Sequence, residues 1–184
     1  MDGTLLSLDV GVFIPAYIKS LAVSIKQASP QLLVPSLVEA SRQMVLKSQP
    51  IGTLESTFDR QFYPAIGLSK DQLQQAIEEF YENTYSSLKS YSIPRPEMVK
   101  TIEWLLKSGY QIVVATNPLF PATAISQRLD WAGLKEVKTQ FSIITSFENF
   151  HFAKPHPHYY AEILAQLGWP DQPAVMIEIG RAHV

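Results

Sequence analysis

Four residues along the chain carry side chains suited to binding and transferring a phosphoryl group: Asp2, Thr116, Asn117 and Lys154. Thr116 and Asn117 follow the apolar run QIVVA, and Lys154 lies in the loop after FSIITS. Because open α/β sheets bind ligands at the carboxyl ends of their strands, we expect these side chains to converge at one rim. There a lysine cation and hydroxyl or amide donors would balance phosphoryl oxygens, while the carboxyl of Asp2 would transfer protons.

Each of these signals is weak when taken alone. An Asp-Gly pair is common in turns, Thr116 is also an ordinary strand-end residue, and Lys154 before a proline also fits a solvated loop lysine. Their order, their spacing and their placement at strand ends together favour the functional interpretation.

The elements that position these residues alternate between strands and helices in the second half of the chain. The stretch YSIPRPEM, 91–98, contains two prolines and is expected to be extended and hinge-like. Short apolar, β-branched runs predict strands buried on both faces, at 111–117, 141–146 and 173–177. The expected helices are 96–109, 121–132 and 157–168. This alternation predicts a parallel sheet covered on both sides.

The first half of the chain is expected to be all-helical. Apolar residues recur there at helical spacing, in predicted helices at 11–28, 34–48, 54–67 and 69–88. Pro35 and Ser36 mark the entry to the second helix, and Ser69 with Gln72 forms a capping box for the fourth. We expect the aromatic residues of this part to form its core and not a substrate pocket: Phe58, Phe62, Tyr63, Phe80, Tyr81 and Tyr85.

Composition excludes several classes of function. The 184 residues are 46% hydrophobic and 17% charged, as in a packed globular protein, and the net charge of −2 gives no basic surface for nucleic acid. No run reaches the roughly 18 apolar residues of a membrane-spanning helix. The chain has no cysteine, which excludes disulfides and Cys-ligated zinc. We expect a cytoplasmic protein that binds neither nucleic acid nor membrane, and the sequence leaves its oligomeric state open.

Taken together, the motifs resemble those of the haloacid dehalogenase-like (HAD) hydrolases that carry a helical cap after the first motif. DGTLL (2–6) resembles the first motif, Asp-x-Asp-Gly-Thr-Leu, without its leading Asp. VVATN (113–117) resembles the second motif and KPHPHYY (154–160) the third. VMI (175–177) resembles the strand before the acidic fourth motif. The resemblance covers essentially the whole chain.

The resemblance implies a fold and a division into domains. The fold is α/β, with a Rossmann-like parallel-sheet core and an all-helical cap inserted after the first motif. The core would comprise residues 1–10 and 92–177, and the cap residues 11–91.

The resemblance also implies a reaction, the Mg²⁺-dependent hydrolysis of a small phosphorylated metabolite through an aspartyl-phosphate. An Asp before the printed chain would attack phosphorus, and Asp2 would protonate the leaving group and then activate water. The backbone carbonyl of Asp2 would also contact Mg²⁺. Thr116 and the Asn117 amide would hold phosphoryl oxygens, and Lys154 would orient the nucleophile.

The residue type at the position of Asp2 distinguishes different activities within the family. The dehalogenases that name the family carry Tyr at this position, because they need neither a leaving-group acid nor a metal, so Asp favours phosphoryl chemistry. A sugar-phosphate mutase and a phosphonate-cleaving enzyme remain alternatives that the cap sequence does not separate.

Both ends of the sequence depart from the family pattern. Met1 occupies the variable position between the two motif aspartates, and EIGRAHV (178–184) is what the sequencing adapter GAGATCGGAAGAGCACACGTC encodes in this frame. We therefore expect a fragment truncated at both ends, with the acidic metal ligands missing beyond Ile177 and with no activity. A divergent natural tail is the alternative for 178–184, and neither Glu178 nor His183 is counted as a site residue.

Two further hypotheses concern the region around Lys154 and the chain as given. His151, His156 and His158 surround Lys154 but offer no helical i, i+4 pair with an acidic partner, so we interpret them as surface histidines and not as a metal site. A hypothesis of a different class is that the chain is a non-catalytic protein that retains a phosphate-binding pocket.

Overall fold

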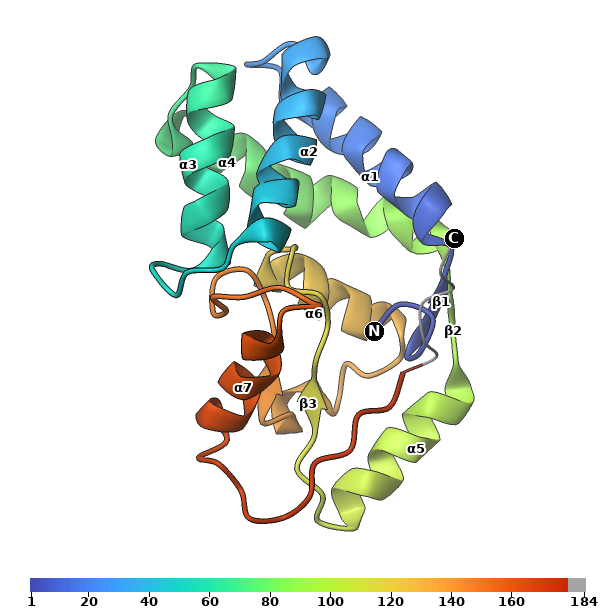
Figure 1. Ribbon diagram of the computed structural model, residues 1–184. Helices are drawn as coiled ribbons and strands as arrows, with labels where there is room; N and C mark the ends of the chain where they lie inside the picture. Colours follow the sequence, from blue (N-terminus) through green and yellow to red (C-terminus); the bar gives the residue numbers. More distant parts are fainter. Residues whose placement is uncertain (179–184) are drawn as a thin grey trace.

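The computed structural model describes residues 1–178 as an α/β fold made mostly of helices, with two small sheets (Figure 1). The first sheet pairs β1, Leu6–Leu8, with β2, Ser92–Pro94, in antiparallel orientation. The second pairs β3, Val113–Val114, with β4, Ile143–Ile144, in parallel orientation. The helices between β1 and β2 in the chain occupy the upper half of Figure 1, and β3, α6 and α7 lie below them.

Residues 10–91 are helical, as predicted. The bounds are α1, Val10–Ser24; α2, Pro30–Leu46; α3, Leu54–Ile66; α4, Lys70–Glu79; a π-helical turn, Phe80–Thr84; and a 3-10 helix, Tyr85–Tyr91. Local capping explains several ends. The predicted capping box of Ser69 and Gln72 begins α4, and Gly67 ends α3 in the left-handed conformation, at φ 69°.

Two details of the helical prediction are wrong. The second helix begins at Pro30 and not near Pro35, because Pro30 takes the first helical position, where a missing N–H costs no hydrogen bond. The predicted single helix 69–88 widens into the π turn at Phe80. This turn lets the successive rings of Phe80 and Tyr81 both be buried, whereas a regular α-helix turns neighbouring side chains about 100° apart.

The prolines of 91–98 give an extended stretch, as expected, but the sequence did not reveal its partner. Leu6 pairs with Pro94 and Leu8 with Ser92, so the chain leaves for the helices through β1 and returns from them through the neighbouring strand β2. Arg95, directly after β2, donates a 2.7 Å hydrogen bond to the carbonyl of Gly3. The two ends of the helical segment are therefore held side by side.

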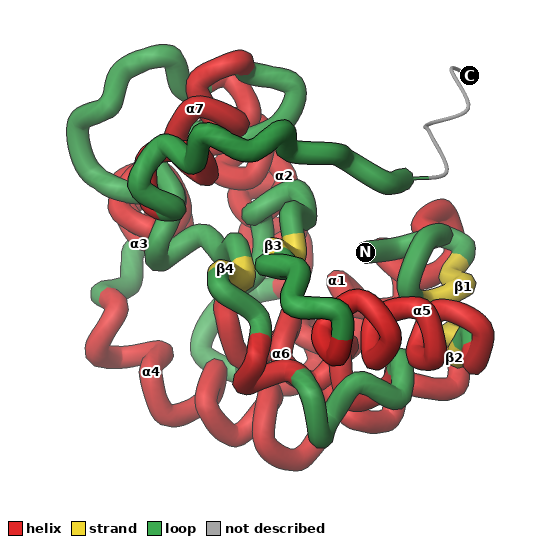
Figure 2. Tube along the Cα trace, turned by 90° about the horizontal axis from the view of Figure 1, so that it is seen from below, coloured by secondary structure: helices red, strands yellow, loops and turns green. Residues whose placement is uncertain are grey.

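The second part of the chain alternates helices and strands, as predicted. Its helices are α5, Pro96–Lys107; α6, Ala122–Trp131; a short 3-10 helix, Lys138–Gln140; and α7, Pro157–Gln166. Figure 2 shows β3 and β4 side by side between α6 and α7. Their parallel pairing agrees with the predicted sheet, although the ladder covers only Val113–Ile143 and Val114–Ile144.

The predicted strand at 173–177 is wrong. This segment is extended but belongs to neither sheet, and Val175, Met176 and Ile177 are 83%, 45% and 66% exposed. An apolar run becomes a buried strand only where a neighbouring strand satisfies its backbone N–H and C=O groups. Within residues 1–178 no such neighbour lies beside it.

The buried core is continuous between the two parts of the molecule. The ring of Tyr85 stacks on Trp131 of α6 with centroids 5.1 Å apart, and Tyr17 of α1 meets Phe120 at 5.3 Å. The backbone amides of Leu54 and Glu55, at the start of α3, donate 2.8 Å hydrogen bonds to carbonyls of the loop after β4. The helices therefore pack directly on the carboxyl-end loops of β3 and β4.

Apart from Glu178, the proposed adapter segment lies outside the described residues, and so does His183. None of the helices within residues 1–178 combines the length and the apolar character needed to cross a bilayer.

Candidate active site

Thr116 lies two residues after β3, and its main chain is held from both sides. Its amide donates a 3.1 Å hydrogen bond to Thr145 Oγ1, and its carbonyl accepts a 2.6 Å hydrogen bond from the Tyr159 hydroxyl. Burial raises the pKa of Tyr159 well above its usual value, so this hydroxyl remains a donor at neutral pH. All three residues are buried, which fixes the end of β3.

The hydroxyl of Thr116 faces its own main chain. It donates a 2.9 Å hydrogen bond to the carbonyl of Asn117, and the Thr116 side chain is only 7% exposed. This hydroxyl can donate to a ligand only after it leaves the Asn117 carbonyl.

Asn117 connects the end of β3 to the loop after β4. Its side-chain Oδ1 accepts a 3.1 Å hydrogen bond from the backbone amide of Lys154. The Lys154 side chain is 14% exposed, its ammonium lies 5.7 Å from the ring centroid of Tyr159, and Glu178 Oε2 is 3.6 Å away. Two predicted site residues that are 37 positions apart in the sequence are thus joined directly.

Asp2 is paired with a cation that the sequence analysis missed. Arg128 of α6 donates a hydrogen bond from its guanidinium to Asp2 Oδ1. The Arg128 side chain is 3% exposed and the Asp2 side chain 30%. The rings of Phe13 and Phe120 lie 5.0 and 5.4 Å from the Arg128 guanidinium carbon, so the cation is buried between aromatic faces.

The amino group of Met1 is influenced by several charged residues of the candidate site. Burial lowers the pKa of this amino group, and the charges of Asp2, Lys154, Arg128 and Glu178 all act on it. Asp2 and Lys154 thus both act electrostatically on this amino group, and the convergence of all four site residues at a common rim stays a prediction. No hydrogen bond between described residues joins Asp2 to Thr116 or Asn117.

The donor set of a magnesium ion is incomplete in residues 1–178. No group of three or more His, Asp or Glu side chains is placed to hold a metal ion in this part of the chain. Mg²⁺ requires several oxygen ligands, and the one carboxylate of the predicted set, Asp2, already binds Arg128. The described residues do not form a magnesium site by themselves, and no chemical step is assigned to the metal.

The three histidines near Lys154 contact other groups. His151 Nδ1 lies 2.6 Å from Glu162 Oε1, and its backbone amide donates to the same carboxylate. His156 and His158 stack on each other and on Phe152. The interpretation of these residues as surface histidines stays a prediction.

Sequence reasoning missed Arg128, Thr145 and Tyr159. For Arg128 a signal was present, because it occupies the same helical stripe as Ile125 and Leu129, both of which are buried. A charged residue on an apolar stripe indicates a buried partner. For the other two no local pattern distinguishes a strand-end threonine or a helix tyrosine that holds a neighbouring strand.

Two comparisons with known proteins bear on this site. A family model described as haloacid dehalogenase-like hydrolase matches residues 1–178. A search of curated proteins gave no match. The matched range contains all four residues that the sequence analysis selected: Asp2, Thr116, Asn117 and Lys154.

Proposed function

The chain belongs to the haloacid dehalogenase-like hydrolases, and on this premise we propose that the site at the end of β3 binds the phosphoryl group of a small phosphorylated metabolite, which the intact protein hydrolyses. The observation that carries the proposal is the 3.1 Å hydrogen bond from the Lys154 amide to Asn117 Oδ1. It joins the loop after β4, which carries Lys154, to the end of the neighbouring parallel strand β3. A cation beside backbone donors is an arrangement suited to phosphoryl oxygens.

Thr116 and Asn117 are the proposed phosphoryl-binding residues. The backbone amide of Asn117 and the hydroxyl of Thr116 would donate to phosphoryl oxygens once that hydroxyl turns from the Asn117 carbonyl. The contacts of Thr145 and Tyr159 hold the Thr116 main chain, so the main chain at this position needs little reorganisation when charge develops. Lys154 would orient the nucleophile and balance the added charge.

Asp2 is the proposed acid and base. First, an aspartate nucleophile bonds to phosphorus while the P–O bond to the leaving group breaks, and Asp2 gives a proton to the departing oxygen. Water then bonds to phosphorus, the aspartyl–phosphorus bond breaks, and Asp2 takes the proton from water. Asp2 can do this only when its contact with Arg128 opens, because its Oδ1 already accepts a hydrogen bond from that guanidinium.

Mg²⁺ enters this proposal from the family alone. When bound it would neutralise phosphoryl charge, and the Asp2 carbonyl is its proposed contact on this chain. The described residues supply neither the remaining ligands nor an assigned nucleophile. We therefore expect the 184-residue chain to bind phosphate without turning over an ester.

The proposed architecture follows the family pattern. Residues 1–10 and 92–177 would form a Rossmann-like core, and residues 11–91 a helical cap. The paired strands β1 and β2 at the two ends of the helical segment and the parallel pair β3 and β4 support this division. The proposed location of the protein is the cytoplasm.

A second candidate function is non-catalytic phosphate binding. The pairing of Asp2 with the buried Arg128 favours it, because this contact removes the one carboxylate of the predicted set from proton transfer. Under this hypothesis Asn117 and Lys154 bind phosphate, and Asp2 serves the structure.

Phosphorus NMR with a panel of phosphate esters and Mg²⁺ distinguishes the two functions. Two proteins are compared in this experiment. One is the 184-residue chain, and the other is the same chain extended by an upstream strand that ends in Asp before Met1. Hydrolysis by the extended protein alone is the expected result, with Lys154→Gln at least about a hundredfold slower and the exposed control Lys107→Gln unchanged. Saturable phosphate binding without turnover by either protein would contradict the hydrolase and support the binding protein.

A further inference from the structure

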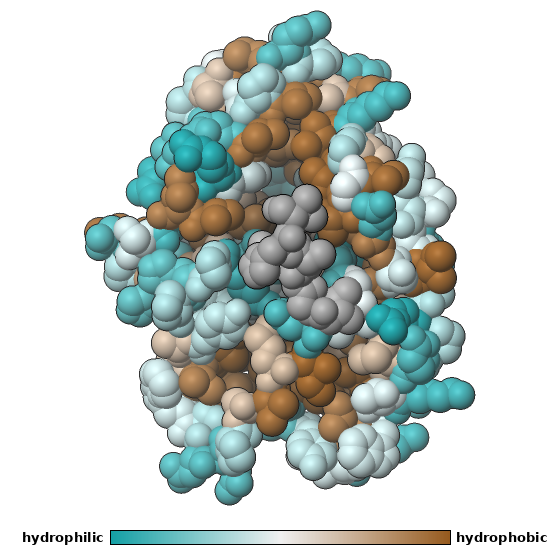
Figure 3. All heavy atoms as spheres, turned by 45° about the vertical axis from the view of Figure 1, so that its right-hand side comes forward, coloured by the Kyte–Doolittle hydropathy of each residue, from teal (hydrophilic) through white to brown (hydrophobic). Residues whose placement is uncertain are grey.

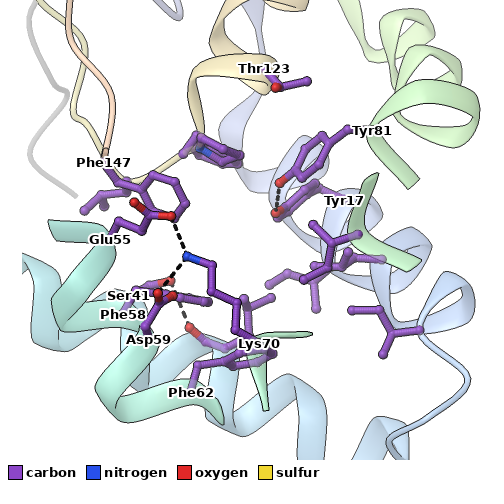
Figure 4. Close-up of a pocket in the computed structure, with 18 of the residues that line it drawn as sticks. Tyr17, Ser41, Glu55, Phe58, Asp59, Phe62, Lys70, Tyr81, Thr123 and Phe147 are labelled. Carbon is purple, nitrogen blue, oxygen red and sulfur yellow. Dashed lines mark hydrogen bonds and ion pairs between the residues drawn. The ribbon is translucent and has the colours of Figure 1, made fainter. Parts of the chain in front are cut away.

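A large cavity lies between the helices, outside the site described above. It has a volume of about 670 Å³ and is formed by α1, α2, α3, α4 and the π turn, together with residues 119–121, 123, 147 and 148 (Figure 4). We call it the helical cavity. Ligand pockets for small organic molecules commonly measure about 300–1,000 Å³. The helical cavity is therefore large enough for a small organic ligand.

The helical cavity is separate from the candidate active site. None of Asp2, Thr116, Asn117 and Lys154 lines it. The ring of Phe120 lines the cavity and also lies 5.4 Å from the Arg128 guanidinium carbon, so one aromatic side chain stands between the cavity and the cation that holds Asp2. Different side chains line the helical cavity and the candidate active site, so the two can bind ligands of different chemical classes.

Most of the cavity wall is apolar. Aliphatic side chains of α1 and α2 and aromatic rings of α1, α3 and the loops form it, and on the face shown in Figure 3 apolar side chains gather over the helical region. The aromatic residues expected to be only core include four that line this cavity: Phe58, Phe62, Tyr63 and Tyr81. Their faces carry the negative side of the ring quadrupole, which attracts a cation.

The charged groups of the wall are mostly acidic. Its carboxylates are Glu55, Asp59, Glu78, Glu82 and Glu148. Its one cation is Lys70, whose ammonium lies 2.7 Å from Glu55 Oε1 and 2.8 Å from Asp59 Oδ2. Figure 4 shows this ammonium directed at both carboxylates. An anionic ligand would have to displace these two contacts of Lys70, and it would also meet the three remaining carboxylates, Glu78, Glu82 and Glu148.

A pair of phenols adds acceptors to the wall. Tyr17 and Tyr81 are 8% and 7% exposed, and their hydroxyl oxygens are 2.9 Å apart. Neither oxygen is hydrogen-bonded to any other residue of the described chain. Each phenol oxygen carries two lone pairs, so the pair can accept a hydrogen bond from an N–H donor.

We propose that the helical cavity binds a small apolar amine in its cationic form. The hydrocarbon or aromatic body lies against the apolar wall, and the ammonium group meets the aromatic faces, the phenol oxygens and the carboxylates. This proposal does not depend on the proposed phosphatase function, because no phosphoryl group takes part in it.

Three ligands of one shape and different charge test the proposal: tryptamine, tryptophol and indoleacetate. Isothermal titration calorimetry of the full chain should show saturable one-to-one binding of tryptamine. Binding of tryptophol should be weaker, and binding of indoleacetate at least about tenfold weaker than that of tryptamine. Binding of the alcohol or the carboxylate as tight as that of the amine, or no saturable binding of tryptamine, overturns the proposal.

Variants locate the binding in the cavity. Glu78→Gln combined with Glu82→Gln should weaken tryptamine severalfold and leave tryptophol unchanged, whereas Glu79→Gln, a neighbour outside the wall, should change neither. Val38→Trp, at a half-exposed wall position, should fill the cavity and abolish binding of all three ligands. Circular dichroism confirms that the variants fold. Equal effects of the wall and control variants would place the binding elsewhere and refute the assignment.

Discussion

Arg128 and Asp2 are 126 positions apart in the sequence, and the guanidinium of one is hydrogen-bonded to the carboxylate of the other. The contact joins α6 to the segment before β1. It also buries a cation between two aromatic rings that come from the helical part and from the loop after β3. This one pair therefore links three regions of the chain.

Replacing Arg128 should destabilise the fold. Arg128→Met keeps an unbranched side chain but removes the charge, the hydrogen bond to Asp2 and the cation contacts with two rings. We expect a loss of about 2 kcal/mol in the free energy of unfolding. This is below the full cost of breaking a deeply buried pair, because the Asp2 side chain is partly exposed. Urea unfolding measures it. Arg42→Met, which removes an exposed pair with Glu39, should leave the free energy of unfolding almost unchanged. Equal losses for the two variants would contradict the structural role of Arg128.

Asn117→Ala should weaken the link between β3 and the Lys154 loop. It removes the side-chain oxygen that accepts the 3.1 Å hydrogen bond from the Lys154 amide, at an expected cost of about 1 kcal/mol. Affinity for inorganic phosphate should fall with it. Thermal unfolding and phosphate titration measure the two effects. Asn83→Ala, at an exposed position on the π turn, is the control, and phosphate affinity as low in that variant would refute the assignment of Asn117.

Tyr159→Phe should loosen the end of β3. The Thr116 carbonyl loses its 2.6 Å hydrogen bond while it stays buried, which we expect to cost about 1–2 kcal/mol. The neighbouring Tyr160→Phe changes a residue that is 39% exposed and should have little effect. Hydrogen exchange at the Thr116 amide, compared between the variants, reports the local loosening. Unchanged protection in Tyr159→Phe would show that Thr145 alone holds this strand end.

The buried tyrosines should make stability fall in alkali. Burial raises the pKa of Tyr17 and of Tyr63 to about 12, above the value of about 10 in an unfolded chain. The unfolded state therefore releases phenol protons first. The contribution of these groups is fully present below about pH 10 and is lost as the pH rises from 10 towards 12.

Urea unfolding at a series of pH values measures this loss. Tyr63→Phe should reduce the slope of stability against pH in that window, whereas Tyr110→Phe, at an exposed position, should not. A slope that both variants leave unchanged would show that other groups cause the alkaline loss.

Local sequence determined most of the elements of this protein. The capping box at Ser69, the glycine after α3 and the apolar periodicity act between residues a few positions apart, so helices could be located within a few residues. The strand-end positions of Thr116, Asn117 and Lys154 followed from apolar runs of β-branched residues in the same way. The family itself could be inferred from motif order.

Only the tertiary structure decided which groups meet. Arg128 finds Asp2, and Tyr159 finds the Thr116 carbonyl, through packing between elements far apart in the chain, which no local pattern encodes. The run at 173–177 has the composition of a buried strand, yet it stays exposed because a strand also needs a hydrogen-bonding neighbour. The aromatic residues of the helices were predicted as core, and five of the six are buried there, with Phe58 packed against them. Only the packing of the helices decided that four of these six also line a cavity.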